Sequence, residues 1–145
     1  MSSDLTAALE NLPHGPSFRF VDALTSLDRG REATGVYHIR GSEDFLTGHF
    51  PGQPMMPGVL LIEAIAQLGG VVAQTDPSIA PMKDLRLTAV RAAKILGAAV
   101  PGQTLEIHAK MEGRMDGLVQ IDGSVSVGGK ILGSARITLT GKPSL

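Results

Sequence analysis

The chain has 145 residues, 43% of them hydrophobic and 19% charged, so we expect one packed domain spanning residues 1–145. It has 13 basic and 14 acidic residues, a net charge of −1, and four Phe, one Tyr and no Trp. This composition excludes the basic surface and the aromatic stacking platforms of nucleic-acid-binding proteins. The absence of cysteine excludes disulfide bonds, thiolate metal sites and a thiol nucleophile.

Two segments bear on the cellular location. The first residues, Met-Ser-Ser-Asp-Leu-Thr, lack a basic region followed by an apolar one, so no signal peptide is expected. The most apolar stretch, around residues 58–73, is interrupted by Glu63 and Gln67 and is short for a membrane span. We therefore expect a cytoplasmic protein that does not bind membranes.

The first third of the chain predicts one short helix and two strands. Leucines spaced along residues 4–12 indicate a short amphipathic helix. Residues 18–28 and 32–40 have the pattern of strands that meet at the turn Asp28-Arg29-Gly30. Residues 41–57 are rich in Gly and Pro, and we expect them to be irregular.

A single long helix follows, from Pro57 to about Gln74. Proline is well tolerated at the opening position of a helix, because that position has no intrahelical partner for its N–H. Apolar residues then occupy almost every side of the helix. Such a pattern predicts a helix that is buried all round.

The second half of the chain has the two-residue period of strands. Apolar and polar residues alternate over 104–111, 119–127 and, in part, 132–139, and Gly128-Gly129 predicts a hairpin between the last two runs. Residues 84–96 give a weaker strand signal because their alternation is broken. We predict an α+β fold in which an antiparallel sheet wraps around one long central apolar helix.

Two titratable residues flank the start of the central helix. Glu63 lies in its second turn among apolar residues, where burial would raise the pKa of the carboxyl and make it a candidate proton donor. His49 lies in the rigid loop upstream and is a candidate base. Fourteen positions and three prolines separate the two residues, so they meet only if the loop folds back or a second subunit supplies one of them.

The helix start at Pro57-Gly58 adds a third chemical group. The first N–H groups of a helix lack intrahelical partners and lie at the positive end of its dipole. They can hold a carbonyl oxygen on which negative charge develops, and glycine lets a substrate approach closely. A polarised carbonyl, a base and an acid suit proton abstraction next to a carbonyl with loss of a β-hydroxyl.

Each of these features also has a structural explanation. A lone glutamate on an apolar helix often has a buried partner or reaches solvent with its carboxylate. A lone histidine in a loop is often solvated, and a Gly/Pro-rich loop often forms only turns. The residue pattern by itself leaves both interpretations open.

Residues 48–67 read Gly-His-Phe-Pro-Gly-Gln-Pro-Met-Met-Pro-Gly-Val-Leu-Leu-Ile-Glu-Ala-Ile-Ala-Gln. This segment resembles the signature of the (3R)-3-hydroxyacyl-[acyl-carrier-protein] dehydratases of type II fatty acid synthesis (FabZ-type), which have the hotdog fold. Other segments of the chain resemble the same family, and they are Leu12-Pro13-His14, Phe18, Val21-Asp22 and Val100-Pro101-Gly102.

The resemblance implies a role for each motif residue. His49 would remove the C2 proton of a 3-hydroxyacyl thioester, and Glu63 would protonate or orient the departing hydroxyl, directly or through a water. The N–H of Gly58 would bind the thioester carbonyl. Gln67, one helical turn after Glu63, would orient that carboxylate.

Further implications concern the partners. Phe50 and Val59 would contact the substrate, and the acyl chain, delivered by acyl carrier protein, would lie in an apolar tunnel along a dimer interface. The base and the acid would come from different protomers of a homodimer, in a trimer of dimers, with no metal or organic cofactor. Glu63, where isomerising relatives have Asp, favours a plain dehydratase, a hydro-lyase.

Residues 84–100 depart from the family pattern. Arg86 and Arg91 stand where the family has a Tyr and an Asp, and Ile95 replaces an aromatic residue. Chain-length preference and carrier docking are therefore open. Arg86, Arg91 and Lys94 either contact an acidic carrier protein or its phosphopantetheine phosphate, or form an ordinary solvated strand face. Two alternatives follow: a dehydratase for another carrier-bound 3-hydroxyacyl thioester, from a polyketide or specialised lipid pathway, or a catalytically silent acyl-binding subunit.

The other histidines have simpler interpretations. His38 and His108 lie on the polar faces of predicted strands, and we expect them to be solvated. His14 is expected to support the N-terminal turn. No spacing of His, Asp and Glu predicts a metal site.

Overall fold

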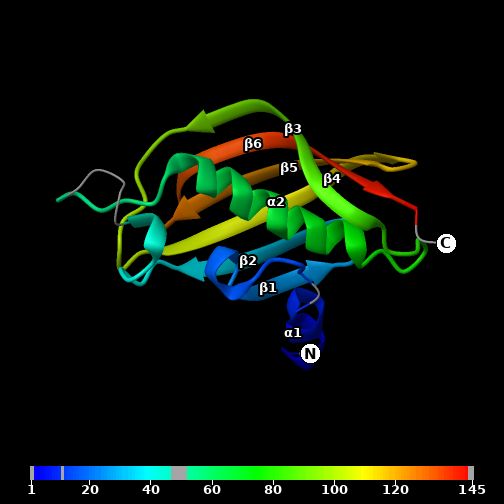
Figure 1. The fold of residues 1–145 in the computed structure, drawn as a ribbon, viewed down its shortest axis with the longest axis horizontal. Coiled ribbons are helices and arrows are strands. Elements are labelled where there is room, and N and C mark those ends of the chain that lie inside the picture. Colours follow the sequence, from blue (N-terminus) through cyan, green and yellow to red (C-terminus); the bar gives the residue numbers. More distant parts are fainter. Residues whose placement is uncertain (1, 11, 47–51, 144–145) are drawn as a thin grey trace.

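The computed structural model describes residues 2–10, 12–46 and 52–143. Six strands form one antiparallel sheet in the order β1-β2-β4-β5-β6-β3, with the long helix α2 lying across one face (Figure 1). The helices are α1 (Ser2–Glu10) and α2 (Gly58–Gln74), with 3-10 turns η1 (Pro16–Phe18) and η2 (Asp44–Leu46); the strands are β1 (Ala23–Asp28), β2 (Glu32–His38), β3 (Lys83–Ile95), β4 (Thr104–Met115), β5 (Leu118–Val127) and β6 (Lys130–Lys142).

Helix α2 and the sheet share one hydrophobic core. Every residue of α2 from Leu61 to Ala73 is buried except Glu63, and the inward face of the strands covers it. Gly123 of β5 lets the helix approach closely, because a Cβ there would overlap the side chain of Ile65. The prediction of an α+β fold, with an antiparallel sheet around a central helix, is confirmed; this is the hotdog arrangement.

The first turn of α2 differs from the prediction. Pro57 caps the helix from outside, and Gly58 is the first helical residue. Val59 is 73% exposed, so the expectation of complete burial is wrong for this turn. In this turn Gly58 and Leu60 are half-buried, with Ile95 of β3 packed against Gly58, whereas Val59 between them is left uncovered. Among the described helices, none combines the length and the apolar character needed to cross a membrane.

The first predicted strand, 18–28, is too long. Strand β1 begins only at Ala23, and residues 16–18 form a 3-10 turn. The main chain in between bonds to a side chain of α2: the N–H of Phe20 donates to Oε1 of Gln67 at 2.8 Å. A helix side chain thus takes the place of a strand neighbour at this point. The N-terminal helix also lies two residues earlier than predicted.

The weakly predicted strand 84–96 is present as β3, at the edge of the sheet. Asp84 and Ala92 have positive φ angles, 55° and 52°, and the register with β6 shifts three times. These irregularities have the form of β-bulges, which explains the broken alternation in the sequence. The hairpin at Gly128-Gly129 is confirmed, with φ angles of 58° and 84°.

Candidate active site

The carboxylate of Glu63 is held by the next turn of α2. Nε2 of Gln67 donates to Oε2 of Glu63 at 3.1 Å, as the four-residue spacing predicts. The Glu63 side chain is 20% exposed, so it remains accessible at the edge of the core. The expected orienting contact between Gln67 and Glu63 is therefore present in the structure.

Gln67 is itself fixed by the main chain of the segment before β1. It is 2% exposed, and its amide bonds the carbonyl of Phe18 and the N–H of Phe20, each at 2.8 Å. Both ends of the amide are thus used, and the side chain has one orientation that satisfies them. A buried polar side chain with three partners is a rigid support for Glu63.

His14 lies beside the same carboxylate. Its Nε2 is 3.4 Å from Oε2 of Glu63, and its ring stacks on Phe18 with centroids 6.2 Å apart. The sequence alone predicts for His14 only a supporting role in the N-terminal turn. The Leu12-Pro13-His14 segment was the available signal, but spacing along the chain does not reveal that this segment crosses α2 next to Glu63.

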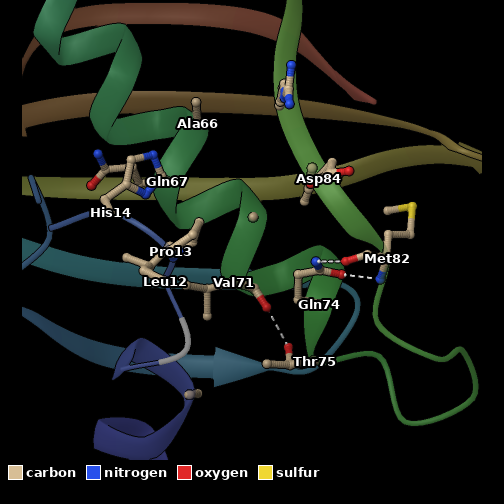
Figure 2. A pocket seen from close by; sticks show the side chains of 14 residues that line it. Leu12, Pro13, His14, Ala66, Gln67, Val71, Gln74, Thr75, Met82 and Asp84 are labelled. Atoms are coloured by element: carbon tan, nitrogen blue, oxygen red, sulfur yellow. Dashed lines mark hydrogen bonds between the residues drawn. The ribbon is translucent and has the colours of Figure 1, made fainter. Parts of the chain in front are cut away.

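A cavity of about 460 Å³ begins next to this cluster and follows α2 toward its C-terminal end. Figure 2 shows His14 and Gln67 near one end, and Gln74, Thr75 and Met82 at the other. The side-chain amide of Gln74 bonds both the N–H and the carbonyl of Met82, at 2.9 and 2.8 Å. The wall is mainly apolar and comes from α1, the 12–14 segment, α2 and the start of β3: Ala8, Leu12, Pro13, His14, Ala66, Gln67, Gly70, Val71, Gln74, Thr75, Met82, Asp84, Leu85 and Arg86.

The N-terminal end of α2 carries N–H groups without a side-chain cap. Just before it, Met56 forms an isolated bridge with Ala99, its N–H donating at 2.8 Å. A Cβ at Gly58 would lie 2.9 Å from Cγ2 of Ile95, so close packing on β3 requires glycine here. Packing is thus an additional reason for this glycine, beside the substrate approach expected from the sequence.

The predicted site residues fall into three groups. Glu63 and Gln67 lie together. Gly58 and Val59 lie one to two turns earlier; at 3.6 residues per turn, Gly58 and Glu63 are about 140° apart around the helix axis. His49 and Phe50 lie outside the described residues.

The remaining predictions concern surface residues. His38 is exposed and its Nδ1 lies 2.9 Å from Oγ1 of Thr104, whereas His108 is partly exposed and pairs with Glu32 at 3.1 Å. Over the described ranges, no group of three or more His, Asp or Glu could hold a metal ion. Arg86, Arg91 and Lys94 are exposed on β3.

The sequence prediction missed a second polar cluster, next to β2. The hydroxyl of Tyr37, which is 3% exposed, donates to Oε2 of Glu43 at 2.8 Å. Burial and this partner raise the pKa of Tyr37 well above its usual range. Arg40 lies over the Tyr37 ring and pairs with Asp22 at 2.7 Å. The cluster supports the segment that leads into η2.

Comparison with known families identifies this arrangement. A family model described as a FabA-like domain matches residues 12–136, which include Glu63, Gln67 and every residue of the cavity wall except Ala8. The chain belongs to the FabA-like family. Its relatives include the 3-hydroxyacyl-[acyl-carrier-protein] dehydratases FabZ of Rickettsia bellii, 30% identical, and Rickettsia africae, 32% identical, each over 95% of both chains.

Solved structures place the FabA-like chain within the same fold. The dehydratase heterocomplex ApeI:P from Xenorhabdus doucetiae matches with a TM-score of 0.79, 18% identity and 97% and 92% coverage of the two chains. A Streptococcus mutans protein bound to acetyl CoA matches with a TM-score of 0.68, 17% identity and 92% and 99% coverage. At these identities the two structures support the fold and nothing more specific.

Proposed function

We propose that this chain dehydrates (3R)-3-hydroxyacyl-[acyl-carrier-protein] to trans-2-enoyl-[acyl-carrier-protein] in type II fatty acid synthesis. The family and the FabZ relatives of nearly equal length support this reaction. The observation that carries the proposal is the carboxylate of Glu63, held at one oxygen by Gln67, a side chain that lines a mainly apolar cavity. A fixed carboxyl group next to an acyl-sized space suits an acid acting on a thioester chain.

The proposed reaction moves two protons and breaks one C–O bond. His49 takes the C2 proton, and the electron pair of that C–H bond forms the C2=C3 double bond. The C3–O bond breaks, and Glu63 gives its proton to the departing hydroxyl, which leaves as water. Proton exchange with solvent then returns His49 and Glu63 to their starting states.

The N-terminal end of α2 is proposed to bind the thioester carbonyl. Negative charge develops on this oxygen as the C2 proton leaves, and the N–H of Gly58 would stabilise it. Val59, exposed beside it, and Phe50 would contact the substrate. The N–H of Gly58 points out of the N-terminal end of α2, whereas Glu63 projects from its side more than one turn later, so we infer that the carbonyl site of one chain is completed by the acid of another.

A second copy of the chain would complete the site. Strand β3 lies at the edge of the sheet, and its 13 residues are exposed except for the half-buried Leu85. Leu87, Val90 and Ile95 are 36%, 45% and 49% exposed along it. A long, exposed edge strand that carries apolar side chains is typical of a surface that pairs with another chain. We infer a homodimer formed through β3, with shared active sites.

The cavity along α2 is proposed to take the acyl chain. It begins at His14 and Gln67, the two side chains that contact Glu63, and extends to Gln74 and Met82. Arg86 is part of its wall on β3, and Arg91 and Lys94 continue the positive charge along that strand. These three side chains suit an acidic carrier protein or the phosphate of its prosthetic group.

The direct test is an activity screen with 3-hydroxyacyl thioesters of varied length, carried by acyl carrier protein or by coenzyme A. We expect formation of the 2-enoyl product, followed by absorbance and mass spectrometry, and its loss in Glu63→Gln. Turnover confined to one specialised carrier would favour the specialised-pathway alternative. Binding of acyl thioesters without turnover by the folded wild-type chain would identify a silent acyl-binding subunit and contradict the proposal.

A further inference from the structure

Among the residues that the structure describes, two side chains make polar contacts with Glu63, and both contact the same oxygen. Nε2 of Gln67 lies 3.1 Å from Oε2 and Nε2 of His14 lies 3.4 Å from it. The two come from different parts of the chain, one from α2 and one from the segment that follows α1. Within the described residues, no contact of this kind is made to Oε1.

His14 is fixed on the side away from Glu63. Its ring stacks on Phe18, and its carbonyl accepts a bond from Arg19 at 3.2 Å. Its Nδ1 is buried and has no hydrogen-bond partner among the residues that the structure describes. A proton on Nδ1 would be buried without an acceptor, so the neutral ring keeps its proton on Nε2, where the carboxylate lies.

We propose that His14 is a positioning residue for Glu63. Together with Gln67, His14 holds Oε2 of Glu63 as the charged oxygen and so directs the reactive proton to Oε1. This inference rests on the proposed dehydration. When Glu63 gives its proton to the departing hydroxyl, the new negative charge is shared with Oε2, which already accepts the N–H of Gln67 and lies 3.4 Å from Nε2 of His14. His14 therefore acts through Glu63 and does not touch the substrate.

The surroundings of His14 are compatible with this role. Glu63 faces it from α2, and Arg19 bonds its carbonyl from the segment before β1. From β3, Asp84 and Arg86 line the same cavity as His14. The cavity wall thus carries charges of both signs, and Glu63 is the charged group at contact distance.

The kinetic test compares His14→Ala with His14→Gln, which keeps an N–H donor. His14→Ala is expected to lower kcat about tenfold to hundredfold, with KM little changed. This loss is part of the roughly 10²–10⁴-fold rate enhancement that a positioned acid contributes. His14→Gln should restore much of kcat.

His38→Ala is the matched control, because His38 is exposed on the sheet and its ring contacts Thr104 of β4. It should leave kcat unchanged. Unchanged kcat in a folded His14→Ala variant would overturn the proposal. Equal losses of kcat in His14→Ala and His14→Gln would also overturn it, since they indicate a packing role.

A second readout does not depend on turnover. In the ring ¹⁵N spectrum of the wild-type protein, Nε2 of His14 should be the protonated nitrogen, and its signal should shift in Glu63→Gln. An inactive wild type that shows this shift would refute the dehydration and leave the contact between His14 and Glu63 established. An active wild type without the shift would refute the role of His14 alone.

Discussion

Oε1 of Gln67 accepts the main-chain N–H of Phe20 at 2.8 Å, and this bond joins the centre of α2 to a segment 47 residues earlier in the chain. The other end of the same amide holds Glu63. A structural bond and the orientation of the proposed acid therefore depend on one side chain. This double use explains why a polar residue lies at a position that is 2% exposed.

Gln67→Ala should destabilise the protein and slow the reaction together. The N–H of Phe20 and the carbonyl of Phe18 would lose their partners, at a cost of roughly 2–4 kcal/mol in the free energy of unfolding. Urea denaturation measures the loss, and Gln120→Ala, at an exposed amide on β5, should change stability by less than about 0.5 kcal/mol. A Gln67→Ala variant as stable as the control would contradict the proposed structural role.

Gly58 permits a test that separates packing from substrate contact. Gly58→Ala brings a methyl group against Ile95 and should destabilise the protein by about 1–3 kcal/mol. Adding Ile95→Ala removes the three atoms that the methyl group would meet, so the two changes should be coupled in a double-mutant cycle. The double variant should regain the stability lost to the clash but remain slow in turnover. Full recovery of activity would show that substrate does not approach Gly58 closely.

The edge strand β3 predicts how the chain associates. Val90→Asp places a charge in the middle of the proposed dimer contact and should shift the protein toward the monomer in analytical ultracentrifugation. Met115→Asp is the control, because Met115 is 69% exposed at the end of β4 and outside this contact. If both variants sediment like the wild type, association through β3 is wrong.

Tyr37 predicts a specific loss of stability at alkaline pH. Its raised pKa means that the folded protein keeps the phenolic proton to a higher pH than the unfolded chain, which loses it near pH 10. The stabilisation of the folded state by the protonated Tyr37 is complete below pH 10 and falls as the pH rises further. Tyr37→Phe should cost about 1 kcal/mol at pH 8, and the difference from wild type should shrink above pH 10. A difference that stays constant to pH 11 would refute this assignment.

The fold was largely predictable because the hydrophobic periodicity of most of its helices and strands can be read from neighbouring residues. The apolar run of α2 and the alternation in β4 to β6 arise from neighbouring residues, and the structure confirms both. Strand β3 gave a weak signal because its bulges break the alternation, as at Ala92. The first strand was predicted too long because a side chain of α2 bonds the main chain there, and no local pattern reveals such a bond.

The candidate site was predictable only where its residues share a helix. Glu63 and Gln67 are four positions apart, so their contact follows from helical geometry. The contact of His14 with Glu63 joins residues 49 positions apart and depends on how the N-terminal segment crosses α2. The Tyr37–Glu43 pair lies across a strand end and a turn, and it too depends on tertiary structure.

The central claim, that two chains share one active site, is tested most directly by mixing two inactive variants. His49→Ala and Glu63→Gln should each abolish dehydration of a 3-hydroxybutyryl thioester while the protein remains folded and dimeric. After subunit exchange, each hybrid dimer would contain one site with both wild-type groups, and mixing should restore part of the wild-type activity. Absence of recovery, with subunit exchange proven by mass spectrometry, would contradict a shared site.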